Sequence, residues 1–401
     1  MRSVEEHQRV VDGLIAARPA APVAVADAAS LVLADDVIAT VSLPIFDNSA
    51  MDGYAVRAEE VAAATAANPV KMVVAEDIPA GRIDIPVHEP GTAHRIMTGA
   101  PIPAGATAVV PVEATDGHTD VVTINEPSAE GRYIRCAGED VRAGTTVLRA
   151  GQVVTPAVVG LAAALGLHEL KVLPRQRVLV ISTGSELVTP GRPLQAGQIY
   201  ESNSMMLASA VREAGADVVA TVITNDDVAQ FISVLNRYAA ESDLIITSGG
   251  VSAGAYEVVK DAFGRAGSQG VEFVKVAMQP GMPQGAGRVA GTPIVTVPGN
   301  PVSALVSFEV FIRPALRSAM GLPARYRQRR SAMLTESLTS PPGKRQFRRG
   351  IFDAAAGTVA SAGPPGSHHV RWLASANCLL DIPADAAKIP AGSQLQIWEL
   401  S

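Results

Sequence analysis

The segment RVLVISTGSELV at residues 177–188 decides the fold of the middle of the chain. Its first half, RVLVIS, is an almost unbroken apolar run, which predicts a strand in a sheet core. The second half brings Thr183, Gly184 and Ser185, residue types that end a strand and open a loop. We therefore expect a buried strand followed by a polar loop.

The same pattern recurs on the C-terminal side of this segment. Most of the further apolar runs of five to seven residues are followed by a helical pattern of ten residues or more. The expected strands cover 217–223, 244–248, 271–277 and 293–297, and the expected helices cover 202–214, about 226–240, 257–266 and 301–320. This alternation predicts a doubly wound, mostly parallel sheet, in which ligands bind beyond the carboxyl ends of the strands.

The flanking regions differ from this α/β part. A capping box of Ser3 and Glu6 opens a helix over residues 3–17. Short β-rich runs separated by Pro and Gly fill residues 40–150, and further short strands after residue 326 predict a small β-barrel or sandwich. The chain is thus expected to be an α/β multidomain protein. Its expected parts are a linker domain (1–40 and 146–175), a β-rich insert (41–145), an α/β domain (176–322) and a C-terminal β-domain (323–401).

Composition excludes several classes of protein. The 401 residues hold 33 Lys and Arg against 39 Asp and Glu, so a net charge of −6 gives no general attraction for nucleic acid or anionic lipid. Two cysteines exclude a disulfide framework and a multi-cysteine metal site. The longest apolar run, 153–167, contains Pro156 and is too short to span a bilayer, and no apolar signal segment follows Met1. We expect a cytoplasmic protein without membrane insertion.

Three loops follow strands of the predicted sheet, at residues 182–186, 247–254 and 297–303. Their glycines let the backbone approach an anion closely. Asn300 as N-cap and Pro301 in the first turn would direct the start of the long helix to the same edge. The loops predict a phosphate or oxyanion site. No Walker A motif or dinucleotide fingerprint occurs, so a nicotinamide dehydrogenase is not supported.

Acidic residues recur beside these loops: Glu186, Asp226, Asp227 and Glu257. Carboxylates beside phosphate oxygens suit Mg²⁺. We expect one of Asp226 and Asp227 to cap a helix and leave the other open. The basic run KRQFRRG at 344–350 suits an oxyanion or an ordinary solvated strand edge, and both interpretations remain open. The polar segment FDNSAMDGYAVR at 46–57 fits no regular periodicity and predicts a functional loop.

That last segment resembles a signature of the molybdopterin molybdenumtransferases, the bacterial MoeA family, shared with the E domain of gephyrin. The resemblance covers nearly the whole chain. Further motifs in family order are IMTGAPIPAGATAVV (96–110), GEDV (138–141), ISTGSEL (181–187), GQIYESN (197–203), SGGVSAG (248–254), PGNPVSA (298–304) and GSHH (366–369). It implies a four-part subunit with a MogA-like α/β domain and a C-terminal β-barrel. It also implies a homodimer whose active site lies between subunits, with the MDGY-bearing insert facing the partner's α/β domain.

The resemblance also implies a reaction and its residues. The implied substrates are molybdate and adenylylated molybdopterin, and a pyrophosphate bond is hydrolysed to release AMP, with Mg²⁺ neutralising charge. The implied catalytic residues are Asp52, Thr98, Asp140, Glu186 and Asp226, of which Glu186 and Asp226 are the metal ligands. The implied molybdate-binding residues are Lys275, Pro298, Pro301, Arg349 and Ser367. The implied pterin- or nucleotide-binding residues are Gly184, Ser185, Ser248, Gly249, Gly250, Ser252, Glu257, Asn300 and Ser303.

The chain departs from the family pattern at two places. Gln279 and Met282 stand where the family commonly has lysines, and Glu257 stands where it usually has an aspartate. The loss of two positive charges motivates an alternative, a gephyrin-like dimeric scaffold that binds a peptide of a membrane or cytoskeletal partner. A third hypothesis, adenylylation of molybdopterin by the α/β domain, is disfavoured because the MDGY and GED segments are features of the insertase.

Overall fold

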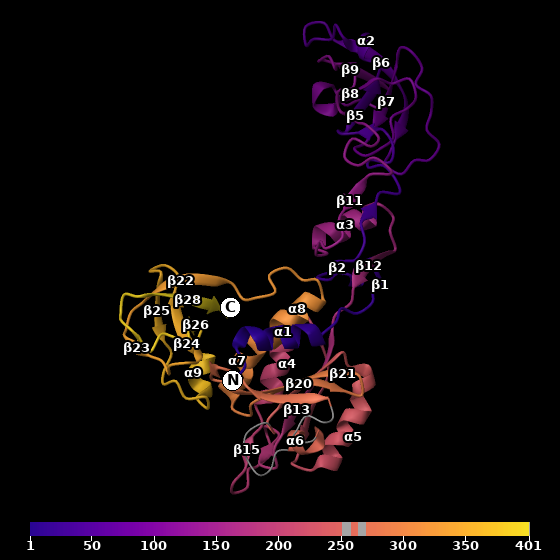
Figure 1. Ribbon diagram of the computed structural model, residues 1–401. Coiled ribbons are helices and arrows are strands. Elements are labelled where there is room, and N and C mark those ends of the chain that lie inside the picture. The colour runs from indigo at the N-terminus through magenta and orange to yellow at the C-terminus, as the bar shows by residue number, and fades with distance from the viewer. Residues whose placement is uncertain (251–257, 264–269, 401) are drawn as a thin grey trace. The chain divides into compact units, whose positions relative to one another are not determined.

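The computed structural model describes residues 1–250, 258–263 and 270–400 (Figure 1). Its contacts divide the chain into two units. The first unit holds residues 1–22, 30–34 and 171–401, and the second holds residues 23–29 and 35–170. The strands β1 (Ala21–Ala24), β2 (Val32–Leu33) and β12 (Glu169–Leu173) lie where the chain passes between the units. The four-part division at residues 40, 145, 175 and 322 stays a prediction.

A six-stranded sheet forms the centre of the first unit. Its order is β16 (Asp217–Thr224), β13 (Arg177–Thr183), β17 (Leu244–Ser248), β21 (Thr292–Val297), β20 (Pro283–Val289) and β18 (Val271–Lys275). The first four strands are parallel, whereas β20 pairs antiparallel with both of its neighbours. The expected doubly wound, mostly parallel sheet is confirmed, and β20 and β18 form its antiparallel edge.

Strand β20 was absent from the sequence prediction. Its sequence, PQGAGRV, lacks the apolar run that marks the other strands. Gly287 lies so close to the Gly270 carbonyl that a Cβ at this position would collide with the oxygen. The glycines of β20 therefore serve close backbone approach, which outweighs their poor strand propensity.

Two apolar cores cover the two faces of this sheet. In β13, Val178 and Val180 join one core, whereas Leu179 and Ile181 join the other, as the alternation of side chains along a strand requires. The first core packs against α1 (Val4–Leu14), α4 (Asn203–Glu213) and the continuous helical run of α7 (Pro301–Ser307), η4 (Phe308–Ile312) and α8 (Arg313–Ala319). The second packs against α5 (Val228–Tyr238) and α6 (Val258–Phe263). Figure 1 shows these helices on opposite faces of the sheet.

Helix α1 begins with the predicted capping box. The Glu6 N–H donates to the Ser3 hydroxyl at 3.0 Å, and the Ser3 N–H donates to the Glu6 carboxylate at 2.8 Å. The helix packs on the α/β part, where the side-chain amide of Gln8 donates to the Val310 carbonyl at 3.0 Å. Its last helical residue is Leu14 rather than residue 17.

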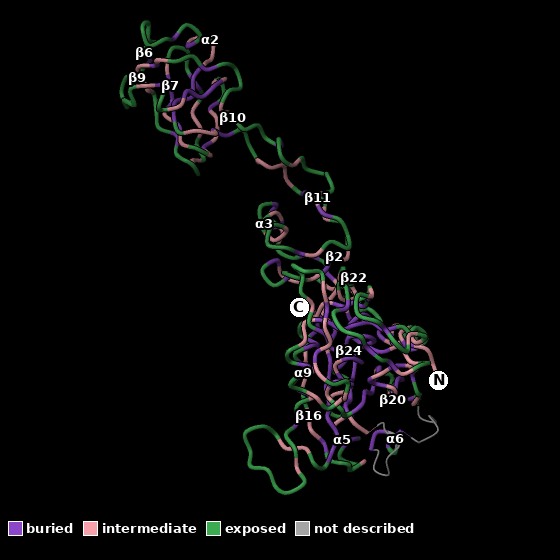
Figure 2. The backbone as a smooth tube through the Cα atoms, turned by 90° about the vertical axis from the view of Figure 1, so that its left-hand side faces the viewer, coloured by how far each residue is buried: buried purple, intermediate pink, exposed green. Residues whose placement is uncertain are grey.

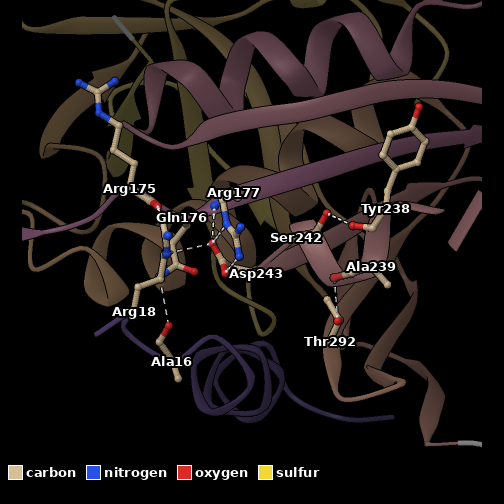
Figure 3. A network of polar contacts seen from close by, with 10 residues as sticks. All are labelled: Ala16, Arg18, Arg175, Gln176, Arg177, Tyr238, Ala239, Ser242, Asp243 and Thr292. Carbon is tan, nitrogen blue, oxygen red and sulfur yellow. Dashed lines mark hydrogen bonds and ion pairs between the residues drawn. The ribbon is translucent and has the colours of Figure 1, made fainter. Parts of the chain in front are cut away.

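A polar network holds the amino ends of β13 and β17 together (Figure 3). The Arg177 guanidinium donates to both oxygens of Asp243, at 2.9 and 3.1 Å, and the Arg177 N–H donates at 2.8 Å. Arg18, beyond the end of α1, lies 3.4 Å from the same carboxylate. Bidentate pairing of this kind fixes the register of neighbouring strands. The polar network thus lies at the amino ends of the strands and leaves their carboxyl ends open.

The C-terminal region of the first unit is a closed barrel of five strands. They run in the order β24 (Arg345–Asp353), β25 (Thr358–Ser361), β22 (Arg329–Leu334), β28 (Gln394–Glu399) and β26 (Cys378–Ile382), and β26 pairs back onto β24. The short strand β19 (Met278–Gln279) adds to β24 from the α/β part. This closure confirms the barrel. Figure 2 shows the buried residues concentrated in the interior of each unit and the exposed residues along its outer loops.

The second unit is β-rich, as expected. Its five-stranded sheet runs β8 (Ala108–Pro111), β5 (Gly53–Val56), β7 (Thr92–Ile96), β6 (Val70–Ile78) and β9 (Val121–Ile124). Tyr54 is fully buried there, and its hydroxyl donates to the His118 carbonyl at 2.9 Å. A short helix, α2 (Ala58–Val61), follows β5.

Short elements complete the fold. In the first unit they are β14 (Leu187–Val188), β15 (Ile199–Tyr200), β23 (Leu338–Thr339), β27 (Lys388–Ile389), η3 (Ala239–Glu241) and α9 (Val370–Ala374). In the second unit they are β3 (Val37–Ile38), β4 (Asn48–Ser49), β10 (Ile134–Arg135), β11 (Thr146–Leu148), η1 (Val25–Asp27), η2 (Val112–Ala114) and α3 (Pro156–Ala164). Within the described residues, none of the helices combines the length and apolarity that crossing a membrane requires.

Candidate functional site

A polar cleft of about 1120 Å³ lies at the carboxyl ends of the parallel strands, within the first unit. All three loops singled out in the sequence line it, and so does a segment of the barrel. Its predicted members are Gly184, Glu186, Asp226, Ser248, Gly249, Gly250, Pro298, Asn300, Pro301, Ser303 and Ser367. The sheet topology thus brings together residues that lie up to 183 positions apart in the chain, from Gly184 to Ser367.

Two carboxylates of the cleft lining follow the neighbouring strands β16 and β13. Asp226 follows β16, and its side chain accepts from the Ser185 N–H at 3.1 Å, while its own N–H donates to the Ser185 hydroxyl at 3.1 Å. Glu186 follows β13, and both carboxylates are exposed. Asp227 accepts from the Gln230 N–H at 2.8 Å as the N-cap of α5. The prediction that one aspartate caps the helix is confirmed, and the other lines the cleft.

Two carboxylates and adjacent hydroxyls are hard oxygen donors. Mg²⁺ typically takes one or two carboxylates and completes its octahedron with water and substrate phosphate. Among the described residues no group of three or more His, Cys, Asp or Glu could hold a metal. The donor set at Glu186 and Asp226 therefore fits Mg²⁺ bound together with a phosphate, and it does not fit a site made of protein ligands alone.

Gly249 and Gly250 directly follow β17 and line the cleft. Their φ angles are +97° and +68°, in the left-handed region that favours glycine. A Cβ on Gly249 would lie 2.7 Å from the Thr183 carbonyl oxygen, and one on Gly250 would lie 2.7 Å from a methyl of Val259. Both positions therefore require glycine for conformation and for space.

Two further cleft residues were not selected from the sequence. The amide nitrogen of Asn203 donates to the Ser248 hydroxyl at 2.8 Å and to the Gly299 carbonyl at 2.6 Å. The buried carboxylate of Glu201 accepts from the Ser182 hydroxyl at 2.7 Å and from the N–H and hydroxyl of Ser204 at 2.6 Å each. Both belong to the GQIYESN segment, which was noted as a motif without any single residue being chosen. The polar residues in this segment were the available signal.

The start of α7 contacts the barrel. Val302 N–H donates to the Ser367 carbonyl at 3.1 Å, which ties the helix to the segment that carries the Ser367 hydroxyl. Asn300 is the N-cap, as expected, and its carbonyl accepts from Ala304 N–H at 2.9 Å, but its side chain makes no capping bond. Its side chain thus remains on the lining of the cleft.

Arg349 is buried in the barrel and donates hydrogen bonds to the backbone of the segment that carries Ser367. It is 2% exposed, and its guanidinium donates to the carbonyls of Gly366 at 3.1 Å, of His369 at 3.2 Å and of Pro364. Burial lowers the pKa of Arg349, and the neighbouring charge of Arg348 acts in the same direction. Arg349 is not among the described residues that line the cleft, so the arrangement shows it as a residue that positions the loop around Ser367.

Lys275 also lies outside the described lining. It is exposed near the end of β18, and its carbonyl accepts from Arg2 N–H at 2.9 Å. Gln279 and Met282, the positions where lysines were expected from the family pattern, do line the cleft. The predicted Ser252 and Glu257 lie outside the described residues.

The other predicted residues belong to the second unit. The Asp52 carboxylate accepts from the Thr98 N–H at 2.7 Å and from the Thr98 hydroxyl at 2.8 Å. These two hydrogen bonds, the backbone one first, hold the pKa of Asp52 below its usual value. Asp140 is exposed, and its N–H donates to the Leu43 carbonyl at 3.1 Å. The structure thus brings Asp52 and Thr98 together.

These features define a class of protein, an α/β ligand-binding domain joined to a β-barrel and a β-rich unit, with a polar cleft at the carboxyl edge of its sheet. Three models of known protein families match three successive parts of the chain. Residues 2–166 match the MoeA N-terminal region (domain I and II), residues 179–318 match a probable molybdopterin binding domain, and residues 331–400 match the MoeA C-terminal region (domain IV).

Relatives match over the full length of the chain. Molybdopterin molybdenumtransferase 2 of Mycobacterium tuberculosis is 71% identical, with 100% of each chain covered. Molybdopterin molybdenumtransferase 1 of the same organism is 36% identical, with 99% of this chain and 98% of the relative covered. A crystal structure of a molybdopterin biosynthesis MoeA protein from Pyrococcus horikoshii superposes with a TM-score of 0.81 at 26% identity, covering 100% of this chain and 99% of that one. The chain belongs to the molybdopterin molybdenumtransferase (MoeA) family.

Proposed function

We propose that this chain inserts molybdenum into adenylylated molybdopterin and hydrolyses the pyrophosphate bond to release AMP. The observation that carries the proposal is the single cleft that three sheet loops and the Ser367 segment of the barrel line together. Relatives at 71% and 36% identity bear the name molybdopterin molybdenumtransferase. In the hydrolysis, a water oxygen bonds to phosphorus, the bridging P–O bond breaks, and the leaving phosphate takes the electron pair.

The residues have separate tasks in this proposal. Glu186 and Asp226 would hold Mg²⁺, which neutralises negative charge on the pyrophosphate when it is bound. Gly249 and Gly250 let the backbone approach the substrate closely, and Ser367 offers a hydroxyl to molybdate. Arg349 keeps the loop of Ser367 in place through its three carbonyl contacts.

We further propose that the protein forms a homodimer whose active site lies between the two subunits. We also propose that it acts in the cytoplasm. In the homodimer Asp52, Thr98 and Asp140 would act on the substrate bound to the partner's α/β domain. The paired hydrogen bonds from Thr98 keep Asp52 ionised, which suits a carboxylate that orients substrate or activates water.

AMP release from adenylylated molybdopterin tests the proposal, with and without molybdate and with Mg²⁺ titrated. Wild-type protein should release AMP in a molybdate-dependent burst. Asp226→Asn should lower the rate about a hundredfold at a fixed Mg²⁺ concentration, because one of two carboxylate ligands is lost. Asp227→Asn is the matched control, since asparagine is also a good N-cap for α5.

A folded dimer that releases no AMP would refute the insertase. The gephyrin-like scaffold would then be the function to test, by recovery of a stoichiometric protein partner. Equal rates for Asp226→Asn and Asp227→Asn would refute only the metal assignment.

A further inference from the structure

Two adjacent basic residues at the start of β24 line different clefts. Lys344 lines the large cleft, whereas Arg345, the first residue of β24, lines a separate cleft of about 470 Å³. Arg345 donates to both Asp381 oxygens at 2.7 and 2.6 Å and to Glu5 at 2.6 Å. Lys344 lies in the bend directly before β24, whereas Arg345 is the first residue of the strand, and the two adjacent residues line different clefts. Arg345 is thus paired with the carboxylates of Asp381 and Glu5, whereas Lys344 lines the large cleft.

The backbone holds Lys344 in place from both sides. Gly343 N–H donates to the Ala384 carbonyl at 2.8 Å, and Arg345 N–H donates to the Ala277 carbonyl at 3.0 Å. The second bond belongs to the pairing of β19 with β24, which joins the α/β sheet to the barrel. The ammonium therefore extends from a fixed point on the barrel side of the cleft.

The charges of the cleft are separated along the sheet. Among the described lining residues, the acidic ones are Glu186, Glu201 and Asp226, and Lys344 is the single lysine or arginine. Asp226 and Glu186 follow the first two strands in the sheet order, whereas Lys344 lies beside β19, which connects to β20, the fifth strand. Three strand spacings of about 4.8 Å separate β13 from β20, roughly 14 Å in all. The cleft therefore has an acidic end and a cationic end.

We propose that Lys344 is the oxyanion-binding cation at the barrel end of this cleft, acting with the Ser367 hydroxyl. The ligand class is a tetrahedral oxyanion, either free molybdate or a phosphate of the nucleotide. The inference rests on the proposed function only for the identity of these substrates. An acidic end that accepts a metal-bound phosphate and a cationic end that accepts a bare oxyanion would also fix the direction in which an elongated substrate lies.

Binding of molybdate alone and of ADP alone to the full-length protein tests this, by calorimetry at several salt concentrations. Lys344→Gln should weaken one of the two probes about tenfold or more and flatten its salt dependence, because a charge-assisted contact is lost. The probe that weakens identifies the oxyanion. Lys344→Arg should stay within about threefold of wild type. Lys388→Gln, at an exposed lysine of β27, is the matched control.

A restoring variant separates charge from packing. Gln279 lines the same cleft, so Gln279→Lys in the Lys344→Gln background should recover binding. Unchanged binding of both probes by Lys344→Gln would overturn the inference, as would wild-type protein that binds neither probe. Oxyanion binding that depends on Lys344 in a protein that releases no AMP would uphold the inference and refute the proposed function.

Discussion

The side-chain amide of Asn203 lies 2.8 Å from the hydroxyl of Ser248 and donates to it. The same nitrogen donates to the Gly299 carbonyl at 2.6 Å. One residue at the start of α4 thus joins the loop after β17 to the loop after β21. Both loops line the cleft, so the spacing of its floor depends on this amide.

Asn203→Ala should lower kcat/KM for AMP release about tenfold to thirtyfold. Two hydrogen bonds of about 1 kcal/mol each are lost, and the two loops lose their common partner. Steady-state kinetics measure the effect. Asn225→Ala is the control. The Asn225 side chain accepts a hydrogen bond from the Asp227 N–H at the start of α5, and Asn225 is not among the described residues that line the cleft. An unchanged kcat/KM for Asn203→Ala would show that the loops hold their positions without it.

Gly249→Ala should lower the thermal unfolding midpoint more than Gly191→Ala. Both glycines have a φ near +90°, at +97° and +91°, so the conformational strain is shared. A Cβ on Gly249 would lie 2.7 Å from the Thr183 carbonyl, whereas nothing lies within 4 Å of one on Gly191. The free energy of unfolding of Gly249→Ala should be about 1–3 kcal/mol lower than that of Gly191→Ala. Equal losses of stability would mean that the loop relaxes freely.

Thr98→Val should raise the pKa of the Asp52 carboxyl. The hydroxyl of Thr98 donates to the ionised carboxylate, and its loss leaves only the backbone donor. Carbon-detected NMR titration of Asp52 measures the change, and the acid limb of the pH–rate profile should move to higher pH with it. Thr98→Ser keeps the hydroxyl and should titrate like wild type. A pKa that does not change would assign the whole effect to the backbone N–H.

His7 should make the first unit less stable in mild acid. Burial lowers the pKa of His7 to about 4, with the charge of Arg2 acting in the same direction, and the ring packs edge-on against Phe311 at 4.7 Å. Because the unfolded chain binds this proton near pH 6.5 and the folded chain only near 4, stability falls as the pH drops through this window. The loss between pH 7 and pH 5 should be about 2 kcal/mol.

His7→Leu should remove this part of the pH dependence. Chemical unfolding followed by Trp fluorescence reports on the first unit, since both tryptophans, Trp372 and Trp398, lie in the C-terminal part of the chain. His118→Gln, at an exposed histidine, should leave the dependence as in wild type. A pH dependence of the same size in His7→Leu would contradict the assignment to His7.

Local signals predicted the helix starts and most strands of the first unit. The capping box of Ser3 and Glu6 is present as expected, and Asp227 is the one of the two candidate aspartates that caps α5, because a cap is decided by residues within one turn. The glycine-rich strand β20 was missed, since its place in the sheet depends on neighbours that approach its backbone. The C-terminal part was predicted as a small β-barrel or sandwich, and the pairing of β26 with β24 that closes the barrel is a long-range contact.

The sequence by itself determined which loops carry the polar and glycine residues, because strand ends, caps and positive-φ glycines follow from short-range sterics and hydrogen bonding. Tertiary structure decided which of these residues meet. It directed Lys344 and Arg345 to different clefts, buried Arg349 behind the loop of Ser367, and placed Asn203 between two loops. Such contacts join residues far apart in the chain, and only the packing of the barrel and helices against the sheet determines their distances.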